Sequence, residues 1–105
     1  MFNAIILPFA KQDIKDAADW YNTRQKGLGR RFTSEVNSKV NTLKSDPYIC
    51  PIRYDNLRTA VLDVFPFMIH YIISETEHII VITAILHTSR NPAIWTGDRD
   101  TDNEK

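Results

Sequence analysis

Apolar side chains recur every three or four residues along two adjacent segments in the first half of the chain. A short apolar run at residues 2–7 precedes them and ends at Pro8, which predicts a first strand. The two periodic segments predict helices over about residues 10–24 and 28–46, and the short link between them predicts an antiparallel helix pair. The apolar positions of the two stripes are Ala10, Ile14, Ala17, Ala18 and Tyr21, then Leu28, Phe32, Val36, Val40 and Leu43.

Strand patterns fill the second half of the chain. Four such segments, separated by polar or proline-containing breaks, lie at residues 52–54, 57–64, 67–73 and 79–86. In the second of them, Ala60, Leu62 and Val64 are expected to share one face of the sheet. A polar loop at residues 74–77 predicts a hairpin between the last two strands, so the four segments are expected to form an antiparallel meander.

These elements predict an α+β fold of order β-α-α-β(3-4), a two-layer domain with a helical hairpin packed on one face of an antiparallel sheet. Because two helices cover only one face, half-exposed strands should alternate apolar and polar side chains. Residues 79–86 do not alternate, since Thr83 is their single polar residue. Either the sheet curls to bury both sides of this strand, or another molecule covers its open face. The domain is expected to span residues 1–95, with residues 96–105 as a polar, flexible tail.

Composition and charge are those of an ordinary globular domain. The 105 residues are 43% hydrophobic and 25% charged, which supports a single domain. The formal net charge is zero, but residues 1–95 hold 11 Lys/Arg against 9 Asp/Glu, so a mildly basic body precedes an acidic tail. No stretch has the charge density of a dedicated DNA-binding face.

Several functional classes lack their sequence signals. Cys50 is the only cysteine, so an internal disulfide and a cysteine metal cluster are excluded, and the three histidines lack zinc-ligand spacing. Neither a Walker motif nor a dinucleotide-binding glycine motif occurs. The first residues lack the basic region of a signal peptide, and no segment approaches the ~20 apolar residues of a membrane helix. A cytoplasmic protein without membrane association, metal or cofactor is expected.

Two motifs and the order of elements resemble the RelE/ParE toxin superfamily. The first motif is F-P-F-x-I-x-Y, from Phe65 to Tyr71, and the second is H-x-x-R-x-P-x-x-W, from His87 to Trp95. The resemblance spans about residues 2–95, and it implies that the last strand lies between the first strand and the rest of the sheet. It also implies the toxin of a type II toxin–antitoxin system, associated with plasmid stabilisation and growth inhibition. Its cognate antitoxin would wrap the toxin and cover exposed apolar surface.

The superfamily includes two activities. RelE-type toxins resemble ribonucleases that cut messenger RNA on the ribosome, whereas ParE-type toxins poison DNA gyrase without a recognised catalytic set. Metal-independent RNA cleavage needs a base, an acid and cations that stabilise the phosphate charge. The candidates for these roles are His87, Arg90 and Arg58. Alternatively, His87 and Arg90 only cap the strand end, and His70 is expected to be a hydrogen-bonded structural residue.

The chain departs from the RelE-type pattern, which has several basic residues on the middle strands and a C-terminal tyrosine. Residues 57–73 contain one Arg and no Lys, and no tyrosine follows Arg90. This departure favours a ParE-like, non-catalytic inhibitor of DNA gyrase. A ribosome-dependent mRNA endonuclease and a non-toxic binding module of the same fold remain alternatives. Without the antitoxin, a homodimer through the same exposed surface is possible.

Four cations at the link between the helical stripes have no acidic residue among them. Arg24, Lys26, Arg30 and Arg31 predict an electropositive corner that meets an acidic partner surface or DNA, although a solvated bend gives the same pattern. Glycines at positions 27 and 29 are expected to let a partner approach closely. The expected contact residues for the target or the antitoxin are Arg24, Arg30, Arg31, Arg53 and Trp95.

Overall fold

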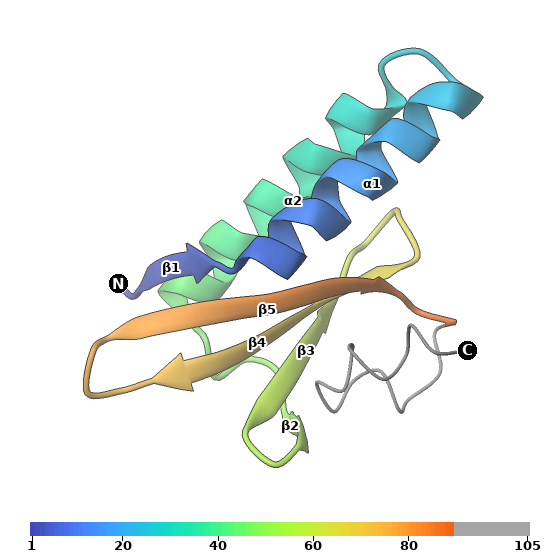
Figure 1. The fold of residues 1–105 in the computed structure, drawn as a ribbon. Helices are drawn as coiled ribbons and strands as arrows, with labels where there is room; N and C mark the ends of the chain where they lie inside the picture. Colours follow the sequence, from blue (N-terminus) through green and yellow to red (C-terminus); the bar gives the residue numbers. More distant parts are fainter. Residues whose placement is uncertain (90–105) are drawn as a thin grey trace.

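The computed structural model describes residues 1–89 and shows a helical hairpin above a five-stranded sheet (Figure 1). Helix α1, Pro8–Arg24, has proline in its first turn, where the fixed φ of the ring suits a helix start. Helix α2, Leu28–Ser45, follows a turn in which Gly27 has a φ of 88°, a left-handed conformation that glycine adopts without a Cβ clash. The predicted antiparallel helix pair is confirmed.

The two helices approach each other closely at Gly29. Its backbone N–H donates a hydrogen bond to Oδ1 of Asn22 at 2.9 Å. A Cβ atom at this position would lie 2.4 Å from the carbonyl oxygen of Ala18 in α1. Gly29 therefore serves the packing of α1 against α2, and the expectation that it opens the turn to a partner is wrong.

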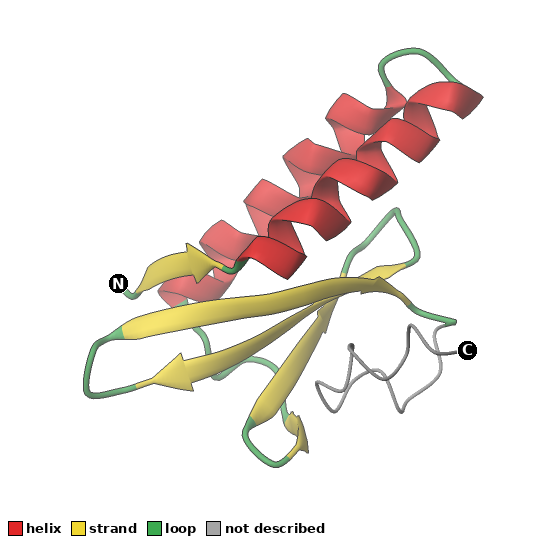
Figure 2. Ribbon diagram, viewed as in Figure 1, coloured by secondary structure: helices red, strands yellow, loops and turns green. Residues whose placement is uncertain are grey.

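The sheet has the strand order β1-β5-β4-β3-β2, so β5 lies between β1 and β4 as the family resemblance implied (Figure 2). The strands are β1 Asn3–Ile6, β2 Ile52–Tyr54, β3 Leu57–Val61, β4 Phe67–Ser74 and β5 Ile79–His87. Strands β2 to β5 form the predicted antiparallel meander, but β1 pairs parallel to β5, so the sheet is mixed rather than antiparallel throughout. Hairpin loops fix the direction only of the strands they join, whereas β1 reaches the sheet through the two helices.

Both helices cover the same face of the sheet, which confirms the predicted α+β arrangement (Figure 2). The stripe residues of α2 and the inward-facing residues of β4 and β5 meet in one core. Its fully buried large side chains include Phe32, Val36, Leu43, Ile69, Tyr71, Ile80 and Ile82. Burial of this apolar surface, at ~25 cal/mol per Å², is the main term that stabilises so small a domain.

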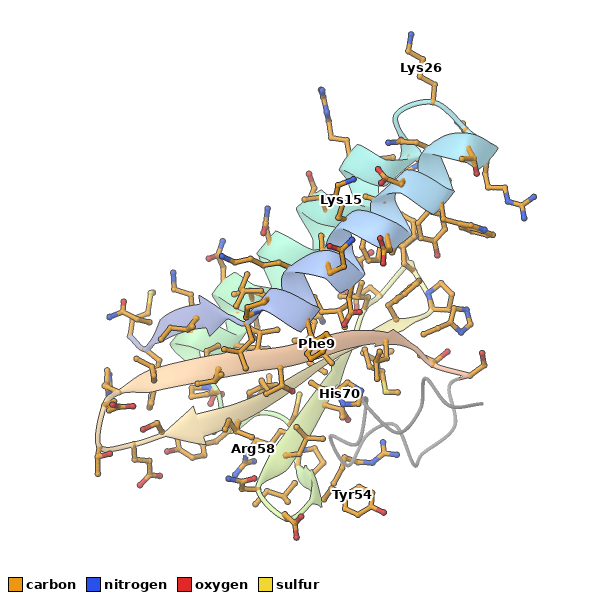
Figure 3. The ribbon with its side chains drawn as sticks, viewed as in Figure 1. Phe9, Lys15, Lys26, Tyr54, Arg58 and His70 are labelled. Carbon is orange, nitrogen blue, oxygen red and sulfur yellow. The ribbon has the colours of Figure 1, made fainter. Side chains whose placement is uncertain are left out.

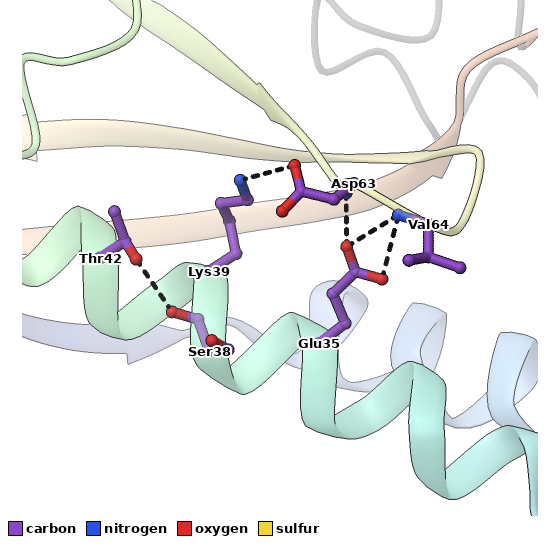
Figure 4. Close-up of polar contacts among 6 residues, drawn as sticks. All are labelled: Glu35, Ser38, Lys39, Thr42, Asp63 and Val64. Carbon is purple, nitrogen blue, oxygen red and sulfur yellow. Dashed lines mark hydrogen bonds and ion pairs between the residues drawn. The ribbon is translucent and has the colours of Figure 1, made fainter.

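Strand β3 ends three residues earlier than predicted, at Val61. Ala60 and Leu62 are buried as expected, but Val64 is 70% exposed. The cause is Glu35 of α2, whose carboxylate accepts hydrogen bonds from the backbone N–H groups of Asp63 and Val64 (Figure 4). These bonds draw the chain out of the sheet toward the helix, so Val64 loses the alternation that predicted its burial.

A β-bulge at Thr83 changes which residues of β5 face the helices. Ile82 pairs with Tyr71 and Ala84 pairs with His70, so Thr83 is an extra residue in β5. Beyond the bulge, the residues of β5 that face the helices change from even to odd positions. Ile80, Ile82 and Ile85 therefore join the core under the helices, whereas Ala84 and Leu86 form a second buried cluster. The single polar residue of the strand therefore lies at the bulge, where its Oγ1 donates to the carbonyl oxygen of His70 at 3.3 Å.

Candidate functional site

His87 is the last residue of β5 and lies beside Phe67 of β4. Its imidazole packs edge-on against the Phe67 ring, with centroids 5.3 Å apart. The backbone N–H of Ser89 donates to Nδ1 of His87 at 3.1 Å, and Ser89 Oγ lies 2.7 Å from the same nitrogen. Because Nδ1 accepts a hydrogen bond, the neutral ring carries its proton on Nε2. These contacts fit the alternative in which His87 caps the strand end.

The cleft beside His87 is acidic. It has a volume of about 200 Å³, and Asp13 and Asp16 of α1 line it together with Ile85, Leu86 and His87. Asp13 Oδ2 also accepts a hydrogen bond of 2.9 Å from the backbone N–H of Ile85, beyond the part of β5 that β1 covers. Among the described residues, the lining of this cleft therefore holds two carboxylates and neither Lys nor Arg.

Arg58 lies on β3, toward the β2 edge of the sheet (Figure 3). Its partner in β4 is Tyr71, whereas the partner of His87 is Phe67. These two positions are roughly 13 Å apart along the strand at ~3.3 Å per residue. The Nη1 of Arg58 donates to the carbonyl oxygen of Cys50 at 2.5 Å, and its guanidinium lies 5.3 Å from the Tyr48 ring. The structure does not bring Arg58 and His87 into one site.

Two further side chains of the sheet are buried. Tyr71 is inaccessible to solvent, and its hydroxyl donates to the carbonyl oxygen of Pro47 at 2.7 Å. Burial raises the pKa of Tyr71 well above that of free tyrosine, so this hydroxyl stays protonated near neutral pH and does not serve as a base. His70 is also buried in β4, as expected of a structural residue, and the hydrogen bond expected of its side chain stays a prediction.

Arg30 and Arg31 are brought together along a groove between α2 and the loop that joins β3 to β4. We call this the α2 groove; its volume is about 540 Å³. Its lining residues are Arg30, Arg31, Ser34, Glu35, Ser38, Asp63, Val64 and Phe65. Two cations of the predicted electropositive corner therefore share one concave surface.

The other cations of the corner do not line the α2 groove. The guanidinium of Arg24 lies 4.5 Å from the ring centroid of Trp20, one turn earlier in α1. Trp20 itself is 52% exposed. Lys26 extends from the tip of the hairpin, away from the sheet (Figure 3). The four predicted cations thus lie in three places. Arg24 stacks on Trp20 of α1, Lys26 lies at the tip of the hairpin, and Arg30 and Arg31 lie on α2.

The remaining predicted contact residues are at the edges of the structure. Arg53 is exposed on β2, the edge strand of the sheet. Arg90 and Trp95 lie outside the described residues. Within residues 1–89, no group of three or more His, Cys, Asp or Glu side chains is arranged to hold a metal ion. In the same part of the chain, no helix is both long and apolar enough to cross a membrane.

Residues 5–92 match the protein family described as the ParE toxin of the type II toxin–antitoxin system, parDE. The chain belongs to this family of ParE toxins. The match covers both helices, all five strands except the start of β1, and the β5 end that carries His87. No curated protein is significantly similar to the chain in sequence.

Solved structures support the family fold. The chromosomal ParDE TA system from P. aeruginosa superimposes with a TM-score of 0.74 and 17% identity, over 85% of this chain and 98% of that one. The isolated E. coli RelE toxin gives a TM-score of 0.63 and 10% identity, over 96% and 99% of the two chains. The RelBE2 toxin–antitoxin complex from Mycobacterium tuberculosis gives 0.57 and 16%, over 82% and 96%. At these identities the likeness shows the shared fold.

Sequence reasoning missed several residues that shape these ParE-family surfaces. Asp13 and Asp16 surround His87, and Glu35 shapes the α2 groove. All three lie on helices beside the apolar stripes, so their position at the boundary of the buried face was the available signal. The pattern could not tell which loop or strand each carboxylate would meet.

Proposed function

We propose that this ParE-family toxin inhibits growth by poisoning DNA gyrase through surface contacts, without catalysis of its own. It acts in the cytoplasm and is neutralised by a cognate antitoxin. The observation that carries this proposal is the separation of two of the candidate ribonuclease groups, Arg58 and His87; the third, Arg90, lies outside the described residues. Within residues 1–89, His87 has Asp13 and Asp16 as its charged neighbours, and Arg58 is engaged with the carbonyl oxygen of Cys50.

The electrostatics of the His87 cleft favour this choice over RNA cleavage. Attack of a 2′-hydroxyl on the adjacent phosphate builds negative charge on the phosphate oxygens, and enzymes stabilise that charge with cations or N–H donors. The described lining of this cleft offers two carboxylates and neither Lys nor Arg for that role. A gyrase poison needs no such charge stabilisation, and exposed groups such as Trp20, Arg24 and Arg31 suit contact with a large protein.

Family membership and the structural relatives support an antitoxin as the partner. The ParE family is defined by type II toxin–antitoxin systems, and the RelBE2 relative is described as a toxin–antitoxin complex. An antitoxin gene usually lies next to the toxin gene in such a pair. We therefore expect a short neighbouring reading frame whose product co-purifies with this chain.

The deciding experiment runs a gyrase supercoiling assay and an in vitro translation assay side by side with the purified protein. We expect inhibited supercoiling and uncut messenger RNA. His87→Ala should leave the gyrase effect within about twofold of wild type, because His87 is placed in no gyrase contact. Messenger RNA cut at discrete ribosome-bound positions, with cleavage abolished by His87→Ala, would overturn the choice and establish the endonuclease alternative. Loss of one positioned catalytic group costs on the order of a hundredfold in rate, so the two outcomes are well separated.

The non-toxic binding module is separated from both toxins by induced expression. Growth arrest that the neighbouring gene product relieves supports a toxin. Unchanged growth while soluble, folded protein accumulates would favour the module.

A further inference from the structure

The α2 groove combines opposite charges that are not equally available to a partner. Glu35 accepts hydrogen bonds from the backbone N–H groups of Asp63 and Val64, including one of 3.0 Å from Val64 (Figure 4). Asp63 lies 3.5 Å from the Nζ of Lys39. Both carboxylates of the groove are therefore already engaged by donors within the chain.

The two arginines of the groove are not so engaged. Among the described residues, the side chains of Arg30 and Arg31 form neither ion pairs nor hydrogen bonds, and both are exposed. A guanidinium offers five N–H donors in a planar fork that matches the two oxygens of a carboxylate. The α2 groove thus presents two exposed guanidinium groups, which a carboxylate can complement.

The opposite wall of the groove is apolar. Val64 is 70% exposed at its rim, and Phe65 lies beneath, where its ring packs against Tyr21 and Phe32. A valine held outward by backbone hydrogen bonds to Glu35 offers a fixed apolar contact. The volume of about 540 Å³ lies in the range of pockets that accept a few side chains.

We propose that the α2 groove binds an acidic segment of the antitoxin, with a carboxylate against Arg30 and Arg31 and an apolar side chain against Val64. The inference rests on the proposed function only for the identity of the partner. A nucleic-acid backbone is the poorer occupant, because a duplex is bound by a longer stripe of cations than this pair and gains nothing from the apolar wall.

The test uses the product of the reading frame adjacent to this gene as the probe. The full chain is co-expressed and separated from it, and their affinity is measured at low and high salt for wild type, Arg31→Glu and Lys26→Glu. The two substitutions change the charge equally on exposed positions of the hairpin, but only Arg31 lines the groove. We expect Arg31→Glu to weaken binding at least about tenfold with a smaller salt dependence, and Lys26→Glu to change it less than about threefold.

A second variant tests the apolar wall. Val64→Ser keeps the backbone N–H that Glu35 accepts and removes only an exposed side chain, so folding should be unaffected. It should weaken the complex several-fold, and the amide NMR signals of Ser34, Ser38 and Val64 should shift when the probe is added to wild type.

Each contrary outcome has its own meaning. Equal losses of affinity from Arg31→Glu and Lys26→Glu would show general charge attraction and refute binding in the α2 groove. If neither Arg31→Glu nor Val64→Ser weakens the wild-type complex, the α2 groove is not the binding site, but the antitoxin remains the partner. No complex with the neighbouring product would overturn both the inference and the proposed partner. Binding of a fluorescent DNA duplex that Arg31→Glu abolishes, without an effect on the protein complex, would assign the groove to nucleic acid instead.

Discussion

Gly29→Ala sets two effects of opposite sign against each other. Inside a helix, alanine is favoured over glycine by about 1 kcal/mol, and the gain at Gly29, the second residue of α2, is at most that. The new Cβ, however, would lie 2.4 Å from the carbonyl oxygen of Ala18, and the side chain of Asn22 would be 2.7 Å away. The amide of Asn22 can rotate, but the Ala18 oxygen belongs to the backbone of α1 and cannot. The helices must therefore move apart by about 1 Å at this point to restore an ordinary contact.

The steric strain of the new Cβ outweighs the gain in helix propensity. Overpacking of this kind costs about 1–3 kcal/mol, and a gap approaching 1 Å forfeits a quarter to a half of each dispersion contact across the helix interface. Rotation of Asn22 also removes the hydrogen bond that its Oδ1 accepts from Gly29. After the propensity gain, we expect a net loss of about 1–2 kcal/mol in the free energy of unfolding. For a chain of this length, that lowers Tm by roughly 4–9 °C.

The assay is urea denaturation and thermal melting of wild type, Gly29→Ala and a matched control, Asn37→Ala. Asn37 is an exposed residue of α2, so its replacement reports the propensity gain without a steric contact. We expect the control to melt at or slightly above the wild-type temperature. If Gly29→Ala instead melts higher than wild type, the close approach of α1 and α2 at Gly29 is wrong.

Three other substitutions test the core, the loop and the sheet. Phe32→Ala removes a fully buried ring and should cost about 3–5 kcal/mol in urea denaturation, with Phe32→Leu clearly milder. Glu35→Ala should lower the free energy of unfolding by about 1–2 kcal/mol and speed hydrogen exchange at the amides of Asp63 and Val64. Unchanged exchange would contradict the hydrogen bonds between Glu35 and these amides. Tyr71→Phe should cost about 1–2 kcal/mol at neutral pH through the lost hydrogen bond. Because burial raises the pKa of Tyr71 in the folded state, its contribution to wild-type stability should be fully present below pH ~10 and should be lost as the pH rises above that value. Tyr71→Phe should therefore lose less stability than wild type above pH ~10. An equal loss in both proteins would refute the attribution of this pH dependence to Tyr71.

The helical half of the fold follows directly from the sequence. Phe32, Val36, Val40 and Leu43 are all buried in α2, because a 3.6-residue period projects them onto one face regardless of what that face meets. The end of β3 did not follow, since the exposure of Val64 depends on Glu35, a residue about thirty positions earlier. Long-range hydrogen bonds of this kind leave no local pattern.

The bulge in β5 could not be predicted from the sequence. A bulge is set by the register against the neighbouring strand, here by the step between His70 and Tyr71. Thr83 marks its place, yet one threonine in an apolar strand is too weak a signal to locate a bulge. The sequence offered His87, Arg90 and Arg58 as one candidate set; the register separates Arg58 from His87, and Arg90 lies outside the described residues.

The β3–β4 loop decides which substitutions can assign a function to either candidate surface. Glu35 ties its start to α2, and the carbonyl oxygen of Pro66 near its end accepts a hydrogen bond of 2.9 Å from the backbone N–H of Thr88, directly after His87. The α2 groove and the His87 cleft are therefore joined through one short segment. A change that releases this loop, such as Glu35→Ala, perturbs both surfaces and can be ascribed to neither. Arg31→Glu and His87→Ala leave both ties in place, so an activity lost in only one of them belongs to the surface that was altered.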